Sequence, residues 1–163
     1  KHSLSNVAMT SEAELLLMNA SRAQLVREVI RPALGRGEII VCDRFYDSTT
    51  AYQGYGRQLD LATVKHIIDL AVGDTRPDLT LFLKVPQSVS EERLRSRQST
   101  MPFIRDRMEE ADRAFFERVA KGYEAIAAAH PERIKVIPAI GTIAEIQSAI
   151  WRVVAPLAAT RVG

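Results

Sequence analysis

Three short apolar segments constrain the fold of this chain more than any other feature. They read EIIVCDR (residues 38–44), DLTLFLKV (residues 78–85) and RIKVIPA (residues 133–139). Each is too short for a typical helix and carries β-branched or bulky apolar side chains, which indicates a strand. Longer stretches with helical periodicity separate them. Strands that alternate with helices and are apolar on both faces predict a three-layer α/β fold, in which helices cover both sides of a parallel sheet.

Capping signals place the helices between these strands. Ser11 and Glu14 have the spacing of a capping box at the start of a long helix, which Gly35 or Gly37 can end. Asp60 can cap a second helix that ends near residue 73. Further helices are expected from residue 88, over about residues 107–129, and from residue 142, where capping-box spacing occurs again.

Length and charge narrow the class of protein. The chain has 163 residues, of which 47% are hydrophobic and 26% charged, and this predicts one globular domain. Its net charge of +2 gives no general basic excess of the kind that coats nucleic acid. We therefore expect any anion site to be local.

The single cysteine and the scattered histidines exclude other classes of site. Cys42 has no partner for an internal disulfide, which favours a reducing cytoplasm, and we expect it to be buried in its strand. The three histidines have no cysteine or carboxylate at ligand spacing, so a transition-metal site is not expected. No apolar run is long enough to span a membrane, so no membrane partner is expected.

The segment VCDRFYDSTTAYQGYGR, residues 41–57, carries the strongest functional signal. Asp43 and Arg44 end an expected strand, and ligands of parallel α/β sheets bind at the carboxyl ends of strands. Arg44 could bind a phosphate and Asp43 could hold a magnesium shell, although an isolated Asp-Arg pair is more often a simple ion pair. Hydrogen-bonding side chains follow at close range and favour a site: Ser48, Thr49, Tyr52 and Gln53. We expect this segment to be turn-like, with a flexible turn at Gly54 and Gly56.

Two further sets of residues are weaker candidates. Met18 and Arg22 are four residues apart in the first expected helix and could face one ligand, but the pattern alone favours a core methionine beside a solvated arginine. A basic run extends from Arg93 to Arg107 and brackets the irregular stretch at residues 101–103. Most such runs are solvated faces, yet an irregular loop flanked by arginines is also what a lid that closes over phosphates requires.

Taken together, these segments resemble thymidylate kinase, the ATP-dependent dTMP kinase family. The resemblance rests on DRFYDSTTAYQGYGR, AELLLMNASRAQLVREVIRPAL, PDLTLFLKV and DRMEEADRAFFERVAKGYEAIA, and it extends from about Met9 to Trp151. It implies a single P-loop nucleoside-monophosphate kinase domain over residues 1–163, with a lid at about residues 95–107. The implied reaction transfers the γ-phosphoryl group of ATP to dTMP with Mg²⁺, and the implied assembly is a homodimer.

The resemblance also implies roles for individual residues. Arg44 matches the arginine that contacts the acceptor phosphate, and Asp43 matches the acid that organises phosphates and, indirectly, magnesium. Arg22 matches the arginine that binds the thymine edge, and Met18 occupies a position where many members have a stacked phenylalanine. Thr49 and Gln53 are implied to face base and sugar, and Tyr52 to lie beside the deoxyribose. Ser48 is a further candidate substrate contact. One of the lid arginines is implied to be catalytic: Arg97, Arg105 or Arg107.

One part of the family pattern does not occur in these residues. Nowhere does a Gly-rich loop end in Gly-Lys-Ser or Gly-Lys-Thr, the element whose backbone N–H groups bind ATP phosphates. The family's first strand, P-loop, first helix and second strand are all lacking, so we expect the sequence to start partway into a longer polypeptide. Two alternatives stay open: a related deoxynucleotide kinase, and a nucleotide-binding remnant without catalysis.

Overall fold

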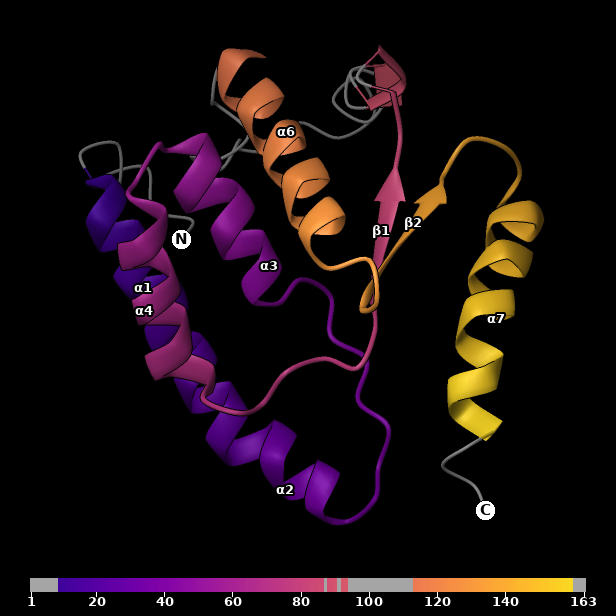
Figure 1. Cartoon of the computed structure of the whole chain (residues 1–163), viewed down its shortest axis with the longest axis horizontal. Coiled ribbons are helices and arrows are strands. Elements are labelled where there is room, and N and C mark those ends of the chain that lie inside the picture. The colour runs from indigo at the N-terminus through magenta and orange to yellow at the C-terminus, as the bar shows by residue number, and fades with distance from the viewer. Residues whose placement is uncertain (1–8, 87, 91, 94–112, 160–163) are drawn as a thin grey trace. The chain divides into compact units, whose positions relative to one another are not determined.

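The computed structural model describes residues 9–86, 88–90, 92–93 and 113–159 (Figure 1). Contacts divide the chain into two compact units. Unit 1 comprises Lys1–Pro77 and Arg105–Ala128, and unit 2 comprises Asp78–Ile104 and Ala129–Gly163. All the described residues of the 41–57 segment belong to unit 1.

Unit 1 begins with a long helical stretch, as the sequence predicts. It consists of α1 (Ser11–Leu25), the π-helical segment η2 (Val26–Ile30) and α2 (Arg31–Gly35). The N-cap is Thr10 rather than Ser11, because the Thr10 hydroxyl accepts the Ala13 N–H at 3.2 Å. A one-residue difference of this kind is usual at helix ends.

The segment expected to be a turn is helical instead. It forms α3 (Tyr46–Thr49) and the π-helical segment η3 (Thr50–Gly56). Gly54 and Gly56 do not make a flexible turn. A Cβ on Gly54 would lie 2.7 Å from Leu61 Cδ2, and one on Gly56 would lie 2.6 Å from Phe115 Cε2. Gly56 is thus required for close packing against Phe115 and Val119, whereas Leu61 could move away from a Cβ at Gly54. A glycine in the sequence does not show whether it serves close packing or backbone freedom.

The next helix, α4 (Leu61–Val72), follows its predicted caps. Asp60 Oδ2 accepts the Thr63 N–H at 2.7 Å, and Gly73 ends the helix with φ 56°. Figure 1 shows α4 beside α1, and the two helices pack against each other. The core cluster of this region also includes residues of η2 and α3, and it contains Leu15, Val26, Ile30, Tyr46, Val64, Ile68, Ala71 and Val72. The helix expected over residues 107–129 is described from residue 113 onward as α6 (Arg113–Ala129).

Residues 38–44 do not form the predicted strand. The only strands in the described ranges are β1 (Thr80–Lys84) and β2 (Ile134–Pro138). A strand requires a neighbour for its backbone hydrogen bonds, and no described residue pairs with 39–43. Val41 is accordingly 93% exposed, and Cys42, expected to be buried, is exposed as well.

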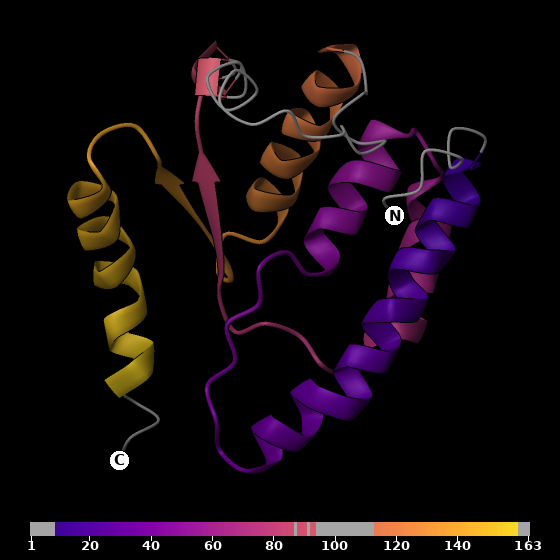
Figure 2. The ribbon, with the colours of Figure 1, turned by 180° about the vertical axis from the view of Figure 1, so that it is seen from behind.

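In unit 2, β1 and β2 pair in parallel, as the α/β prediction requires. Thr80 is opposite Ile134 and Lys84 is opposite Pro138, and Figure 2 shows the two arrows side by side. The helix α7 (Ile143–Ala159) packs on β2. Its predicted capping box is confirmed, because Thr142 and Glu145 exchange hydrogen bonds between side chain and backbone at 2.8 Å and 3.3 Å.

The lid expected at residues 95–107 lies outside the described residues. Among the helices that are described, none is both long enough and apolar enough to cross a membrane.

The packing at Gly56 yields a stability prediction. Gly56→Ala should lower the free energy of unfolding by about 1–3 kcal/mol, because the added methyl group would overlap Phe115 and Val119. Gly35→Ala is the matched control, since a Cβ there meets nothing within 4 Å and the residue is helical. Urea denaturation of both variants measures the difference. Equal stability of the two variants would show that Gly56 is not a packing requirement.

Candidate functional site

Arg44 has the most unusual backbone among the predicted site residues. Its φ is 63°, in the left-handed region that residues other than glycine adopt infrequently. Its Nη2 donates a hydrogen bond to Tyr52 Oη at 2.9 Å, and its guanidinium carbon lies 4.8 Å from the centroid of the Tyr52 ring. The structure therefore brings together Arg44 and Tyr52, two residues singled out from the sequence.

The surroundings of Arg44 stabilise its positive charge. Partial desolvation lowers the pKa of Arg44, but Tyr52, Tyr123 and Asp43 raise it, and the net direction is upward. The side chain is thus a permanent cation on the surface of unit 1, where an anionic group can approach it.

Aromatic rings hold Tyr52 in place. Its ring makes edge contacts with Phe115, at a centroid distance of 6.0 Å, and with Tyr123, at 6.3 Å. Tyr123 Oη also shares a hydrogen bond of 2.7 Å with Ser48 Oγ, and burial raises the pKa of Tyr123. Tyr123 lies in one of the segments that carry the family resemblance, but the sequence pattern indicates no role for it. Its contact with Ser48 is therefore seen only in the structure.

Arg22 joins α1 to the start of the helical motif. Its Nη1 donates to Asn19 Oδ1 at 2.9 Å and to Thr49 Oγ1 at 2.8 Å, and its Nη2 donates to the Phe45 carbonyl at 3.3 Å. Desolvation lowers the pKa of Arg22, against the opposing effect of Cys42 and Asp47. Arg22 is thus a half-buried, multiply bonded group rather than the solvated arginine that the pattern alone favoured.

A buried network lies further along the same two elements. Gln53 Nε2 donates to Glu14 Oε1 at 2.8 Å, and Arg57 forms an ion pair with Glu14 at 3.1 Å. Arg57 also lies over the Phe115 ring, with its guanidinium carbon 4.6 Å from the centroid. Sequence analysis assigned Glu14 only a capping role and missed this contact, because no local pattern connects residues 39 positions apart.

Met18 lies on α1 midway between Glu14 and Arg22. The three residues follow each other at intervals of four, so they share one face of the helix. Met18 is partly buried. The structure therefore agrees with the expected common face of Met18 and Arg22.

Asp43 and Cys42 are both exposed, next to Arg44. The Cys42 thiol contacts the Arg44 carbonyl oxygen at 3.5 Å, and desolvation raises the pKa of the thiol. Within the described ranges, no group of three or more His, Cys, Asp or Glu side chains could hold a metal ion.

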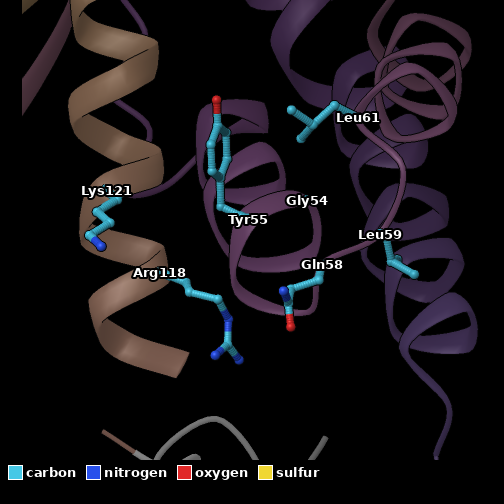
Figure 3. A pocket seen from close by; sticks show the side chains of 7 residues that line it. All are labelled: Gly54, Tyr55, Gln58, Leu59, Leu61, Arg118 and Lys121. Atoms are coloured by element: carbon cyan, nitrogen blue, oxygen red, sulfur yellow. The ribbon is translucent and has the colours of Figure 1, made fainter. Parts of the chain in front are cut away.

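A shallow hollow of about 290 Å³ lies beyond the other end of the motif. Figure 3 shows the residues that line it: Arg118 and Lys121 on α6, Tyr55 on η3 and Gln58 just after η3. Arg118 Nε donates to the Gly56 carbonyl at 3.0 Å. None of the candidate site residues that the structure describes lines this hollow. The three candidate lid arginines, Arg97, Arg105 and Arg107, lie outside the described residues.

Comparison with known proteins assigns the family. The sequence model of thymidylate kinase matches residues 1–150. The thymidylate kinase of Synechococcus sp. (strain JA-2-3B'a(2-13)) is 47% identical over 144 residues, which cover 88% of this chain and 66% of the relative. That of Syntrophotalea carbinolica is 47% identical over 147 residues, which cover 90% of this chain and 68% of the relative.

A solved structure agrees with the sequence relatives. The crystal structure of thymidylate kinase from Ehrlichia chaffeensis superposes with a TM-score of 0.69 at 30% identity, over 91% of this chain and 67% of that one. The chain thus spans about two thirds of the length of these relatives. These matches confirm the resemblance found in the sequence, and the chain belongs to the thymidylate kinase family.

Proposed function

We propose that this chain forms the acceptor-nucleotide part of an enzyme that transfers the γ-phosphoryl group of ATP to dTMP, giving dTDP for dTTP synthesis. Members of the thymidylate kinase family are ATP-dependent kinases of dTMP, and relatives at 47% identity support the same activity here. The residues that the family resemblance assigns to dTMP lie on α1 and along the described part of the 41–57 segment.

The observation that carries the proposal is the conformation of Arg44. A left-handed arginine costs of the order of 1 kcal/mol or more, and such strain persists where the surroundings fix it and often where function requires it. Tyr52 fixes this guanidinium by a hydrogen bond and by its ring. Phosphoryl transfer depends mainly on positioned positive charge, which an arginine held in this way supplies to the acceptor phosphate.

The other contacts fit a nucleoside monophosphate. Arg22 is proposed to bind the thymine edge, with Thr49 holding it and Met18 giving the base an apolar contact. Tyr52 is proposed to lie beside the deoxyribose, where a 2′-hydroxyl would be crowded. Ser48 and Gln53 complete the proposed substrate contacts.

The donor side of the reaction is proposed from the family. Asp43, an exposed carboxylate next to Arg44, fits a magnesium ion whose other ligands are water and phosphate. The ion would neutralise charge on the transferred group. Arg97, Arg105 and Arg107 stay the candidate lid residues, and no ATP-phosphate loop occurs within these 163 residues.

The larger assembly is also a proposal. We infer one nucleotide kinase domain with three layers and a lid at about residues 95–107, acting in the cytoplasm. A homodimer through the first long helix is supported by Leu16, Leu17 and Val29, which are large apolar residues exposed along α1 and η2. Solution mass tests the dimer.

Arg44→Ala should test the phosphate contact directly. We expect kcat/KM for dTMP in the full-length protein to fall by an amount equivalent to about 2–4 kcal/mol, the scale of a lost charged contact at a reacting phosphate. Arg36→Ala, which removes an exposed arginine paired with Glu38, should leave kcat/KM unchanged. Steady-state kinetics of both variants give the comparison. An unaltered rate for Arg44→Ala would remove this residue from the site.

Tyr52 should control the choice between deoxyribose and ribose. Replacing Tyr52 by Val should relax discrimination against ribonucleoside monophosphates, because the smaller side chain leaves room for a 2′-hydroxyl. Tyr52→Phe is the control, since it keeps the ring and loses only the hydrogen bond to Arg44. Competition between dTMP and its ribose counterpart measures the effect. Full discrimination by the valine variant would contradict the sugar contact.

A further inference from the structure

Glu14 is a buried carboxylate that the proposed chemistry does not use. It is 4% exposed and lies on α1, in contact with η3 and the residue after it. Its Oε1 accepts from Gln53 Nε2 at 2.8 Å and from Arg57 Nε at 3.3 Å, and its Oε2 accepts from Arg57 Nη2 at 3.1 Å. Burying a carboxylate is costly unless it is paired, and Arg57 supplies the opposite charge.

The carboxylate determines which way the Gln53 amide faces. An ionised carboxylate can only accept hydrogen bonds, so the group that Gln53 turns toward Glu14 has to be its NH₂. Gln53 is itself 2% exposed, and a buried amide held in this way cannot turn over freely. In the described part of the chain, no hydrogen bond reaches the amide oxygen of Gln53. That oxygen is left as an acceptor.

The contact between Glu14 and Gln53 lies close to the proposed base site. Glu14 and Arg22 are two helical turns apart on α1, with Met18 between them. On the facing segment, Thr49 bonds to Arg22 and Gln53 bonds to Glu14. The two side-chain bridges therefore lie on either side of Met18, the residue proposed to contact the base.

We propose that Glu14 is a positioning residue that sets the base preference through Gln53. It holds the Gln53 amide oxygen ready to accept a hydrogen bond from a ring N–H of the acceptor base. Thymine carries such an N–H at N3, whereas N3 of cytosine is an acceptor that would meet another acceptor. The arrangement favours dTMP over dCMP. The inference rests on the proposed function and adds the origin of its specificity.

Glu14→Gln in the full-length protein tests this orientation. A carboxamide has one oxygen, and Arg57, which can only donate, should take it. The new NH₂ group then faces Gln53 and turns that amide over, so that its NH₂ points toward the base. We expect the affinity ratio of dTMP to dCMP, measured by calorimetry, to fall at least about tenfold, the scale of one mismatched buried hydrogen bond.

The control variant neutralises a different glutamate, one that does not contact Gln53. Glu38→Gln breaks an exposed ion pair with Arg36 and should keep the wild-type ratio. Thermal unfolding of each variant records the loss of stability separately. A Glu14→Gln variant that is less stable but keeps the wild-type ratio would overturn the inference, because a merely structural role changes stability and not base choice.

A second variant covers the case in which Glu14→Gln does not fold. Gln53→Met keeps the side-chain length and the Glu14–Arg57 ion pair but removes the amide, so the dTMP to dCMP ratio should again fall about tenfold. An unchanged ratio would overturn the inference. Failure of the wild-type protein to bind dTMP would instead contradict the proposed function, whereas wild-type binding with unchanged ratios in both variants contradicts only the role of Glu14 and Gln53.

Discussion

The candidate site depends on polar contacts that fasten α1 to the helical 46–56 stretch. Arg22 to Thr49 and Glu14 to Gln53 are side-chain hydrogen bonds between buried or half-buried groups, and Arg57 adds an ion pair. Apolar packing of α1 on α4 supplies the general driving force, but apolar packing is tolerant of small displacements. Hydrogen bonds and ion pairs require fixed distances and angles, so they do not allow such displacements. They therefore determine the register of α1 against the helical 46–56 stretch.

The candidate side chains form two groups that differ in exposure to solvent. Arg44 and Tyr52 lie at the exposed end, where charge can meet a phosphate, and the rings of Phe115 and Tyr123 on α6 support them. Arg22 and Gln53 lie deeper, where hydrogen bonds are stronger and a missing partner costs more. The proposed phosphate contact therefore lies near solvent, and the proposed base contacts lie in the interior.

Local signals in the sequence predicted most of the helices and both described strands. The caps at Asp60 and Thr142 depend on neighbours three residues away, which any reader of the sequence can see. The strand expected at residues 38–44 does not form, because a strand needs a neighbouring strand for its hydrogen bonds and no described segment pairs with these residues. For the same reason Cys42, expected inside, is exposed. Glu14 and Tyr123 were missed as site neighbours because their contacts join distant parts of the chain.

The left-handed backbone at Arg44 has a consequence for anyone who engineers this protein. At φ 63° a glycine would relieve the strain, and an asparagine would tolerate it better than most residues. A screen that selects only for thermal tolerance would therefore tend to enrich such replacements at this position, and each would discard the guanidinium. Directed evolution toward heat resistance has to select for turnover at the same time, because a gain in stability at position 44 would remove the proposed phosphate contact.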